Sequence, residues 1–187
     1  MYKRQFLAYA RANPGKLNYA SPGNGSPHHL AMEMFKNRTK TFLTHIPYRG
    51  AAPALQDVMG GQVPCMFLDL AAGLPVITSG KVRALAIGSA KRVAALPDVP
   101  TLAEAGVPNT EVFAFQGILA PAGLPAAITT RLNTDLNKAL LNPAVVKRMN
   151  DFGMEALPGT PEQFRAMARA ESKRWGEIIK AAGVKLD

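Results

Sequence analysis

The sequence predicts an α/β fold in which a parallel sheet is covered by helices on both sides. Short segments rich in β-branched and aromatic residues alternate with segments of helical length, and Gly, Pro or Asn stands at most of the boundaries between them. Strands that alternate with helices favour a parallel sheet, because each return to the sheet needs a crossover connection. The predicted strands of the first half of the chain cover residues 16–20, 41–46, 63–68 and 82–87.

Four helices are expected between and before these strands. Ser26 followed by Pro27 is typical of a helix start, because the serine caps free amides and proline suits the first turn. Asn13-Pro14-Gly15 and Gly60-Gly61 are typical of helix ends. The expected helices cover residues 6–12, 27–37, 51–59 and 71–78.

The second half of the chain predicts mainly helices. After a connector over 90–100, we expect a short helix over 101–105, one strand over 113–119, and helices over 126–141 and 144–152. Thr160 and Gln163 form a capping-box pattern at the start of the last helix. Apolar residues at helical spacing predict a buried stripe along that helix: Phe164, Met167, Ala168, Trp175, Ile178, Ile179 and Ala182.

The order of elements predicts two parts, an α/β lobe over residues 1–105 and one strand with helices over residues 106–187. One strand cannot form a sheet, so the second part needs strands from elsewhere. We therefore expect an exposed apolar face on the 113–119 strand and on the following helix at Ile128, Leu132 and Leu136. No leader-like segment precedes the first helix, which indicates either a cytoplasmic protein or a chain that begins within a longer one.

Composition restricts the class of protein. The 187 residues are 48% hydrophobic and 19% charged, which is typical of a globular protein rather than a disordered one. The longest apolar stretches are interrupted by Pro, Gly or a charge, so no membrane span is expected. The single cysteine, Cys65, excludes an intramolecular disulfide and is predicted to be a core residue.

The charge balance favours an anionic partner. There are 22 basic and 13 acidic residues, so the formal net charge is +9. A small carboxylate, a nucleic acid and an acidic surface are all compatible with this sign. The basic residues occur in scattered pairs and never in a run of five, so we expect no nucleic-acid partner.

A glycine-rich loop between the first strand and the following helix is the most informative local feature. Glycines allow a tight turn, and amides at a helix start favour an anion. His28 replaces the third glycine of a dinucleotide motif, and no acidic residue follows at the expected distance, so nicotinamide binding is not expected. A purely structural turn remains an alternative. The candidate ligand-binding residues of this loop are Ser21, Gly23, Asn24, Gly25 and Ser26.

A second loop of the same kind follows the next strand. In a parallel sheet, successive strands end at one edge, so the two loops should meet there and offer amides to a carboxylate. The candidates in this loop are Tyr48, Arg49, Gly50 and Ala51. Arg49 either contacts the ligand or is a solvated surface charge. Asp69, after the third strand, either faces the ligand edge or caps the next helix.

The sequence predicts no catalytic or metal site. His28 and His29 are adjacent and therefore face different directions on a helix, and no cysteine or carboxylate completes a ligand set with His45. We find no nucleophile with a base and no carboxylate pair, so we expect no enzyme activity and no cofactor.

These segments, in this order, resemble the substrate-binding receptors of tripartite tricarboxylate transporters, also called Bug-type receptors. The similar segments are Asn13-Pro14-Gly15-Lys16-Leu17-Asn18-Tyr19-Ala20-Ser21, Gly23-Asn24-Gly25-Ser26, Pro47-Tyr48-Arg49-Gly50-Ala51-Ala52-Pro53-Ala54, Gly60-Gly61-Gln62-Val63, Ser79-Gly80-Lys81-Val82-Arg83-Ala84-Leu85-Ala86, Leu96-Pro97-Asp98-Val99-Pro100-Thr101-Leu102-Ala103-Glu104-Ala105-Gly106, Phe115-Gln116-Gly117 and Ala120-Pro121-Ala122-Gly123. The sequence departs from the family pattern at Pro64-Cys65 and Leu68-Asp69-Leu70.

The resemblance implies a type II periplasmic binding protein-like fold, with one parallel-sheet lobe and an incomplete second lobe. It implies a periplasmic receptor that binds small carboxylates in an interlobe cleft and delivers them to the membrane permease subunits of the transporter. The alternative from the residues alone is an α/β enzyme or regulatory domain that binds an anionic small molecule.

Overall fold

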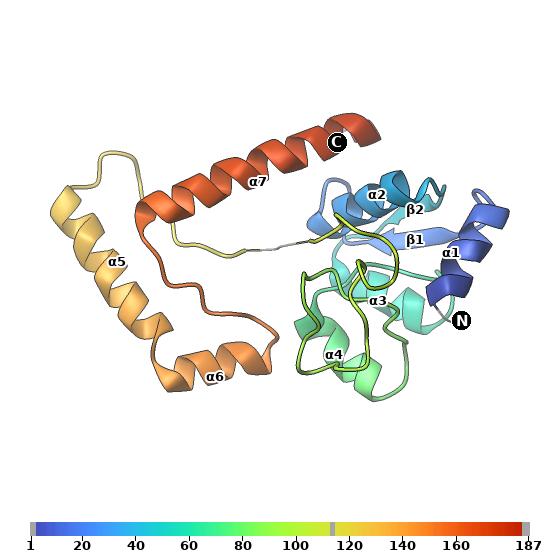
Figure 1. The fold of residues 1–187 in the computed structure, drawn as a ribbon, viewed down its shortest axis with the longest axis horizontal. Coiled ribbons are helices and arrows are strands. Elements are labelled where there is room, and N and C mark those ends of the chain that lie inside the picture. Colours follow the sequence, from blue (N-terminus) through green and yellow to red (C-terminus); the bar gives the residue numbers. More distant parts are fainter. Residues whose placement is uncertain (1–2, 113–114, 185–187) are drawn as a thin grey trace. The chain divides into compact units, whose positions relative to one another are not determined.

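Seven helices and two short parallel strands are found in the computed structural model, which describes residues 3–112 and 115–184 (Figure 1). Their order is α1 (Lys3–Ala12), β1 (Asn18–Ser21), α2 (Pro27–Thr39), β2 (Thr44–Pro47), α3 (Ala51–Met59), α4 (Leu70–Thr78), α5 (Ala126–Leu140), α6 (Pro143–Asp151) and α7 (Pro161–Ala182). None of the helices in these two ranges combines the length and the apolar character that a membrane crossing requires.

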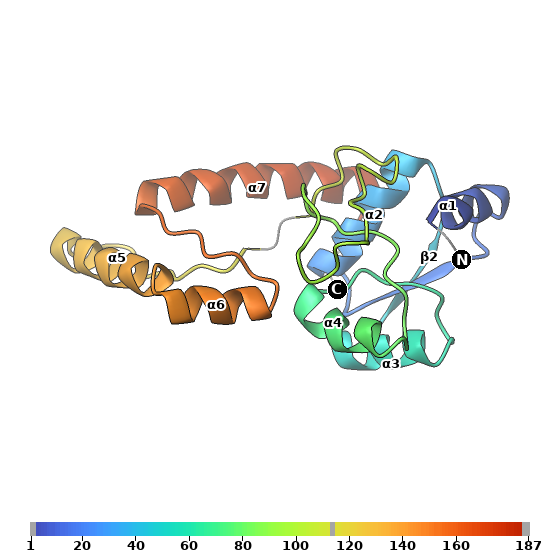
Figure 2. The same cartoon turned by 60° about the horizontal axis from the view of Figure 1, so that its bottom comes forward.

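The sheet is the parallel pair β1–β2, with Asn18 opposite Thr44 and Ser21 opposite Pro47. Helix α2 is the crossover between the strands, and α2 and α3 lie on opposite faces of the sheet (Figure 1, Figure 2). Alternation along β1 explains this arrangement, because Tyr19 packs in the cluster that includes α2, and Ala20 packs against Ala54 of α3. The expected parallel sheet with helices on both faces is confirmed.

Two of the four predicted strands are wrong. Segment 63–68 forms only one isolated bridge, between Met66 and Ala20, and segment 82–87 forms only one, between Ile87 and Thr101. In the first segment Pro64 has no amide to donate to a ladder. In the second, the amide and carbonyl of Ile87 are both bonded to segment 100–102, which keeps it from pairing with the sheet.

Two further expectations fail beyond residue 100. Residues 101–105 form a hydrogen-bonded turn instead of a helix, with the Ala105 amide donating to the Thr101 carbonyl at 3.0 Å. Gly106 follows with φ of 90°, a conformation that stops helix growth after one turn. Residues 115–119 of the predicted 113–119 strand have no strand structure, and residues 113 and 114 lie outside the described residues.

Local capping signals are confirmed. Ser26 Oγ accepts the His29 amide at 3.3 Å at the start of α2. The Thr160–Gln163 capping box is reciprocal, with amide-to-side-chain distances of 2.8 Å and 3.2 Å. The apolar stripe of α7 has the predicted positions, but its residues are half-buried rather than buried.

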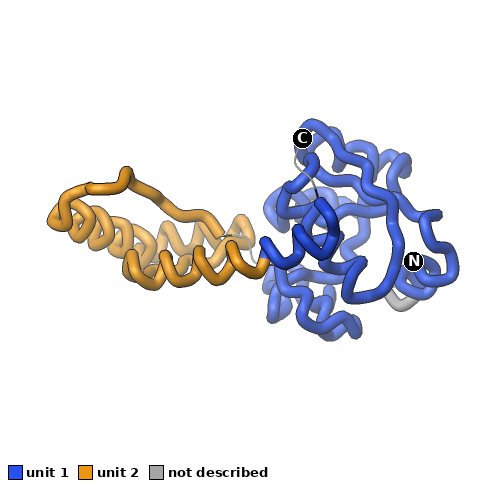
Figure 3. The backbone as a smooth tube through the Cα atoms, turned by 90° about the horizontal axis from the view of Figure 1, so that it is seen from above, with its two compact units in different colours: residues 1–114, 175–187 blue, residues 115–174 orange. Residues whose placement is uncertain are grey.

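The chain divides into two compact units, residues 1–114 with 175–187 and residues 115–174, so that one division falls within α7 (Figure 3). The predicted lobe boundary between residues 105 and 106 stays a prediction.

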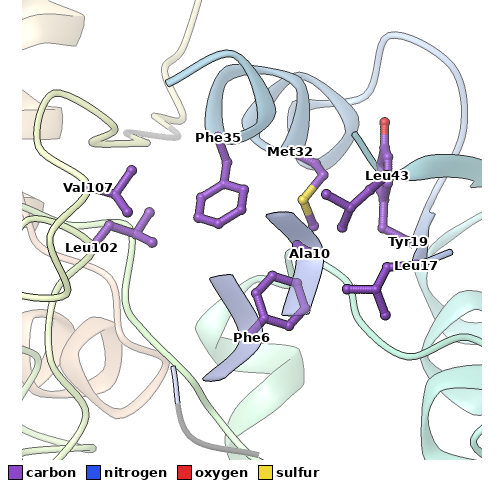
Figure 4. Packing of buried hydrophobic residues seen from close by; sticks show 9 residues of the cluster. All are labelled: Phe6, Ala10, Leu17, Tyr19, Met32, Phe35, Leu43, Leu102 and Val107. Carbon is purple, nitrogen blue, oxygen red and sulfur yellow. The ribbon is translucent and has the colours of Figure 1, made fainter. Parts of the chain in front are cut away.

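The main hydrophobic core of the first unit joins α1, β1, α2 and the turn near residue 102 (Figure 4). Phe6 and Phe35 lie with ring centroids 6.3 Å apart, and Tyr19 and Leu43 are fully buried. The side chains of this cluster are Phe6, Ala10, Leu17, Tyr19, Met32, Phe35, Leu43, Leu102 and Val107. Burial of these side chains fixes α2 against the sheet and thereby places the loop that precedes α2.

Candidate functional site

The two predicted ligand loops are joined at the carboxyl edge of the parallel strands. The Tyr48 amide donates to the Ser21 carbonyl oxygen at 2.9 Å, and the Gly50 amide donates to the Pro22 carbonyl oxygen at 3.1 Å. A Cβ added at Gly23 would lie 3.5 Å from the Tyr48 carbonyl oxygen, so the two backbones are in contact there. The expectation that the loops meet at one edge is confirmed.

The first loop uses its own amides within the protein. Gly23 donates to Ser21 Oγ at 3.2 Å, Gly25 donates to His29 Nδ1 at 3.1 Å, and the Ser26 amide donates to the Gly23 carbonyl at 3.3 Å. These three amides are therefore not available to a ligand. A tight loop of this kind satisfies its own donors before it can offer any to a ligand.

The second loop offers donors at the N-terminus of α3. Gly50 stands before the helix with φ of 113°, and a Cβ built there would meet nothing within 4 Å. The first amides of a helix have no intrahelical acceptor, and those of Ala51 and Ala52 have none elsewhere in the described chain. Arg49 is exposed and makes no hydrogen bond or ion pair with any described residue. This loop carries the positive end of a helix dipole and an arginine side by side.

Asp69 lies at the N-cap position of α4, where its side chain makes no capping hydrogen bond. Its Oδ2 lies 3.2 Å from Nε2 of His28, in the first turn of α2, and the carboxylate is two-thirds exposed. This approach does not have hydrogen-bond geometry, and both ring nitrogens of His28 are without a hydrogen-bond partner in the described chain. The structure thus brings Asp69 to the edge where α2 begins.

A polar network beneath the first loop was not expected from the sequence. The rings of His29 and His45 stack with centroids 3.9 Å apart and planes at 14°, and His45 stacks on Tyr19 at 4.8 Å. Ser21 Oγ lies 2.6 Å from His45 Nε2. Ser21 is fully buried, so its hydroxyl is enclosed by protein atoms.

Glu33 connects this stack to a cation. Its Oε1 accepts the Tyr19 hydroxyl at 2.5 Å and Lys36 Nζ at 2.6 Å, and it lies 3.7 Å from His29 Nε2. The Glu33 and Lys36 side chains are both largely buried, at 13% and 14% exposed. A paired and hydrogen-bonded carboxylate can be tolerated at such a depth.

Burial controls the protonation of this network. It lowers the pKa of His29, where Lys36 acts in the same direction and Glu33 opposes it. Burial, with the neighbouring His29 ring, lowers the pKa of His45 to about 4. Burial and the hydrogen bond to Glu33 raise the pKa of Tyr19. All three rings are therefore neutral at pH 7.

Sequence spacing could have indicated part of this network. His29, Glu33 and Lys36 are spaced at i, i+4 and i+7, so they share one face of α2. Tyr19 and Ser21 share one face of β1 by alternation. His45 joins them only through the register that places it opposite Tyr19, and that pairing is a long-range property.

Two points of the sequence analysis remain, the metal site that was not expected and the single cysteine. No group of three His, Cys, Asp or Glu residues in the described part of the chain could hold a metal ion. Cys65 is half-buried against the main core, and its thiol lies 3.4 Å from the Asn18 carbonyl oxygen. Burial raises the pKa of this thiol to about 12, which keeps it protonated.

The fold of the chain matches solved periplasmic binding proteins, which places it in their structural class. The family whose pattern matches is the tripartite tricarboxylate transporter family receptor, over residues 3–184. The chain belongs to this family, whose members are solute receptors rather than enzymes.

Curated relatives extend the likeness over nearly the whole chain. The UPF0065 protein in the tcbD–tcbE intergenic region of Pseudomonas sp. (strain P51) is 40% identical over 94% of this chain and 52% of its own length. Protein BugT of Bordetella pertussis is 37% identical over 96% of this chain and 55% of its own length. The chain therefore spans about half the length of the curated relatives it matches.

Solved structures agree with the fold. Rpa4515 of R. palustris, solved with adipate, is 35% identical with a TM-score of 0.88, over 98% of this chain and 61% of its own. The periplasmic binding protein BugD is 36% identical with a TM-score of 0.82, over 97% and 62%. MatC of Rhodopseudomonas palustris, solved with malate, is 32% identical with a TM-score of 0.77, over 94% and 61%.

Proposed function

We propose that the chain is the carboxylate-binding part of a periplasmic solute receptor, and that the receptor delivers its ligand to the membrane permease subunits of a tripartite tricarboxylate-type transporter. The observation that supports this most is the pair of joined loops, with the unpaired α3 amides and the exposed Arg49 on either side of Gly50. The family and the dicarboxylates named with two of the solved structures, adipate and malate, point to the same ligand class.

In this proposal, the second loop supplies the principal donors. A ligand carboxylate accepts hydrogen bonds from the amides of Ala51 and Ala52, where the helix dipole favours negative charge. Arg49 supplies a charge-assisted, bidentate contact. Gly50 leaves room for the ligand, because nothing lies within 4 Å of the position its Cβ would occupy.

The first loop and Asp69 form the rest of the rim of the proposed carboxylate site. Asn24 is exposed at the tip of the loop, and Gly23, Gly25 and Ser26 shape the backbone around it. We assign Ser21 a supporting role, since its buried hydroxyl binds the loop from beneath. Asp69 disfavours a second negative charge next to it, and thereby selects how a dicarboxylate is oriented.

Ligand-observed NMR titration with a carboxylate panel tests the proposal. The panel contains malonate, succinate, glutarate, adipate, malate, citrate and benzoate, with glucose as the neutral compound. We expect saturation transfer to one or more carboxylates and none to glucose. The absence of transfer to every carboxylate would refute the proposed function of this chain.

A matched pair of arginine variants locates the site. Arg49→Ala should weaken binding of the carboxylate by about 10- to 100-fold, the range for a lost charged hydrogen bond. Arg38→Ala removes the same charge from an exposed position in the last turn of α2, away from the loops, and should leave binding unchanged. Equal weakening by both variants would indicate a general effect of charge and not a contact from Arg49.

A further inference from the structure

Two histidine rings hold the glycine loop from its buried side. The Gly25 amide donates directly to His29 Nδ1 at 3.1 Å. The Gly23 amide donates to Ser21 Oγ at 3.2 Å, and that oxygen lies 2.6 Å from His45 Nε2. The two rings stack at 3.9 Å, so the direct contact to Gly25 and the contact to Gly23 through Ser21 meet at one histidine pair.

The contact to Gly25 fixes the protonation of His29. A backbone amide can only donate, so Nδ1 must carry no proton in order to accept. The single proton of the neutral ring is then on Nε2, which faces Glu33 Oε1 at 3.7 Å. Protonation of Nδ1 would set two N–H groups against each other and abolish the contact with Gly25.

The surroundings of the pair keep it neutral. The titratable and charged groups that face the rings are Tyr19, Glu33 and Lys36. Glu33 favours a protonated ring, but its Oε1 already accepts the hydroxyl of Tyr19 and the ammonium of Lys36. Lys36 opposes another positive charge on either ring, and His29 opposes protonation of His45.

We propose that His29, stacked on His45, is a positioning residue that forms a pH-sensitive clasp, which holds loop 21–26 in its carboxylate-binding shape only while the His29 ring is neutral. The inference rests on the proposed function of that loop. As the pH falls, protonation breaks the Gly25 contact and disrupts the stack. The loop is then released and carboxylate binding weakens, although neither ring contacts the ligand.

NMR titration of the ¹⁵N-labelled chain without ligand tests the clasp directly. Between about pH 7.5 and about pH 4.5, the ring nitrogens and the glycine amides are read in one sample. We expect the Nε2–H tautomer of His29 at the upper end, and a Gly25 amide shift with the same midpoint as the titration of His29. A Gly25 amide that stays constant while His29 titrates overturns the proposal, as does an Nδ1–H tautomer.

Variants separate positioning from general stability. In His29→Asn the side-chain oxygen replaces Nδ1 as an acceptor and does not titrate, so the Gly25 amide should keep its position but lose its pH dependence. His28→Gln is the matched control, because neither nitrogen of His28 binds a loop amide, and the Gly25 titration should persist. Loss of the Gly25 titration in His28→Gln would contradict the assignment to His29.

Adipate titrations provide the second readout. Between about pH 7.5 and about pH 4.5, the affinity of the wild-type chain should fall several-fold more than that of His29→Asn, in which the remaining fall reports the protonation of adipate itself. Equal pH dependence in the two proteins counts against the clasp. No adipate binding at the upper pH, together with intact coupling of Gly25 to His29, counts against the proposed function and leaves the clasp supported.

Discussion

The amide of Tyr48 donates to the carbonyl oxygen of Ser21 at 2.9 Å, one residue beyond the last pair of the parallel strands. This bond continues the sheet into the two loops, so that the loops cannot move independently at their starting points. The Tyr48 hydroxyl also donates to Asp57 of α3 at 2.6 Å, which fixes the second loop to the helix that follows it. The rim of the proposed site is therefore built on the most regular part of the fold.

Gly50→Ala should destabilise the chain by about 1–2 kcal/mol, because residue 50 has a φ that L-residues with a Cβ rarely adopt. A Cβ at this position meets no atom within 4 Å, so backbone strain is the whole cost. Urea unfolding measures the change in the free energy of unfolding.

Gly176→Ala is the control for this substitution. Gly176 lies within α7, and a Cβ there also meets nothing within 4 Å. Alanine in a helix interior is favoured over glycine by about 0.5–1 kcal/mol, so this variant should be more stable than the wild type. The same sign of change for both variants would show that backbone conformation at Gly50 is not the cause.

Acid should destabilise the chain through His45. Burial and His29 lower its folded pKa to about 4, whereas the unfolded chain has the ordinary value near 6.5. The unfolded state therefore binds more protons, so this stabilisation is complete above about pH 6.5 and is lost as the pH falls toward 4. The contribution of His45 between about pH 7 and about pH 4.5 is about 2 kcal/mol.

His45→Gln isolates that contribution, because glutamine keeps a polar group near the position of Nε2 but does not titrate. The free energy of unfolding from urea curves at the two pH values should fall by less in this variant than in the wild type. An identical fall in both proteins would assign the acid sensitivity to other groups.

Short-range signals predicted the helices and the loop starts well. Ser26 and Thr160 cap their helices as expected, because a cap depends on residues within three positions of one another. The meeting of the two loops also followed from the sequence, because parallel strands end at the same edge regardless of what else the sheet contains.

Contacts between residues distant in the chain could not be predicted from the sequence. Segments 63–68 and 82–87 have strand-like composition, but whether they join a ladder depends on partners distant in the chain, and each makes only one bridge. The histidine stack could not be predicted for the same reason. His29 and His45 come from a helix and a strand, and only the packing of α2 on the sheet brings them together.

Cys65 should be unreactive toward a disulfide reagent in the folded chain. With a thiol pKa of about 12, the thiolate fraction near pH 8 is about one in ten thousand, against roughly a quarter for an ordinary cysteine. The reaction with Ellman's reagent in buffer should be slower than in denaturant by about a thousandfold. Fast stoichiometric reaction of the folded protein would contradict the packing of Cys65 against the core.

The unit formed by residues 115–174 should bind an apolar dye. Ile118 and Leu119 are 73% and 81% exposed, and Ile128 and Leu132 on α5 are 47% and 48% exposed, as expected from the sequence, whereas Leu136 is half-buried. Exposed apolar side chains gathered in this way bind dyes such as ANS and favour self-association.

Replacing both Ile128 and Leu132 with glutamine tests this expectation, because the two residues are four apart and share a face of α5. The double variant should show lower ANS fluorescence and less concentration-dependent association in sedimentation velocity. The reason is that glutamine exposes less apolar surface to water than isoleucine or leucine does. Thr130→Gln changes an exposed polar residue on the same helix and should leave both readings as they are in the wild type. If the double variant binds the dye as strongly as Thr130→Gln does, the exposed face of α5 is not the dye site, and the apolar surface must lie on another part of the chain.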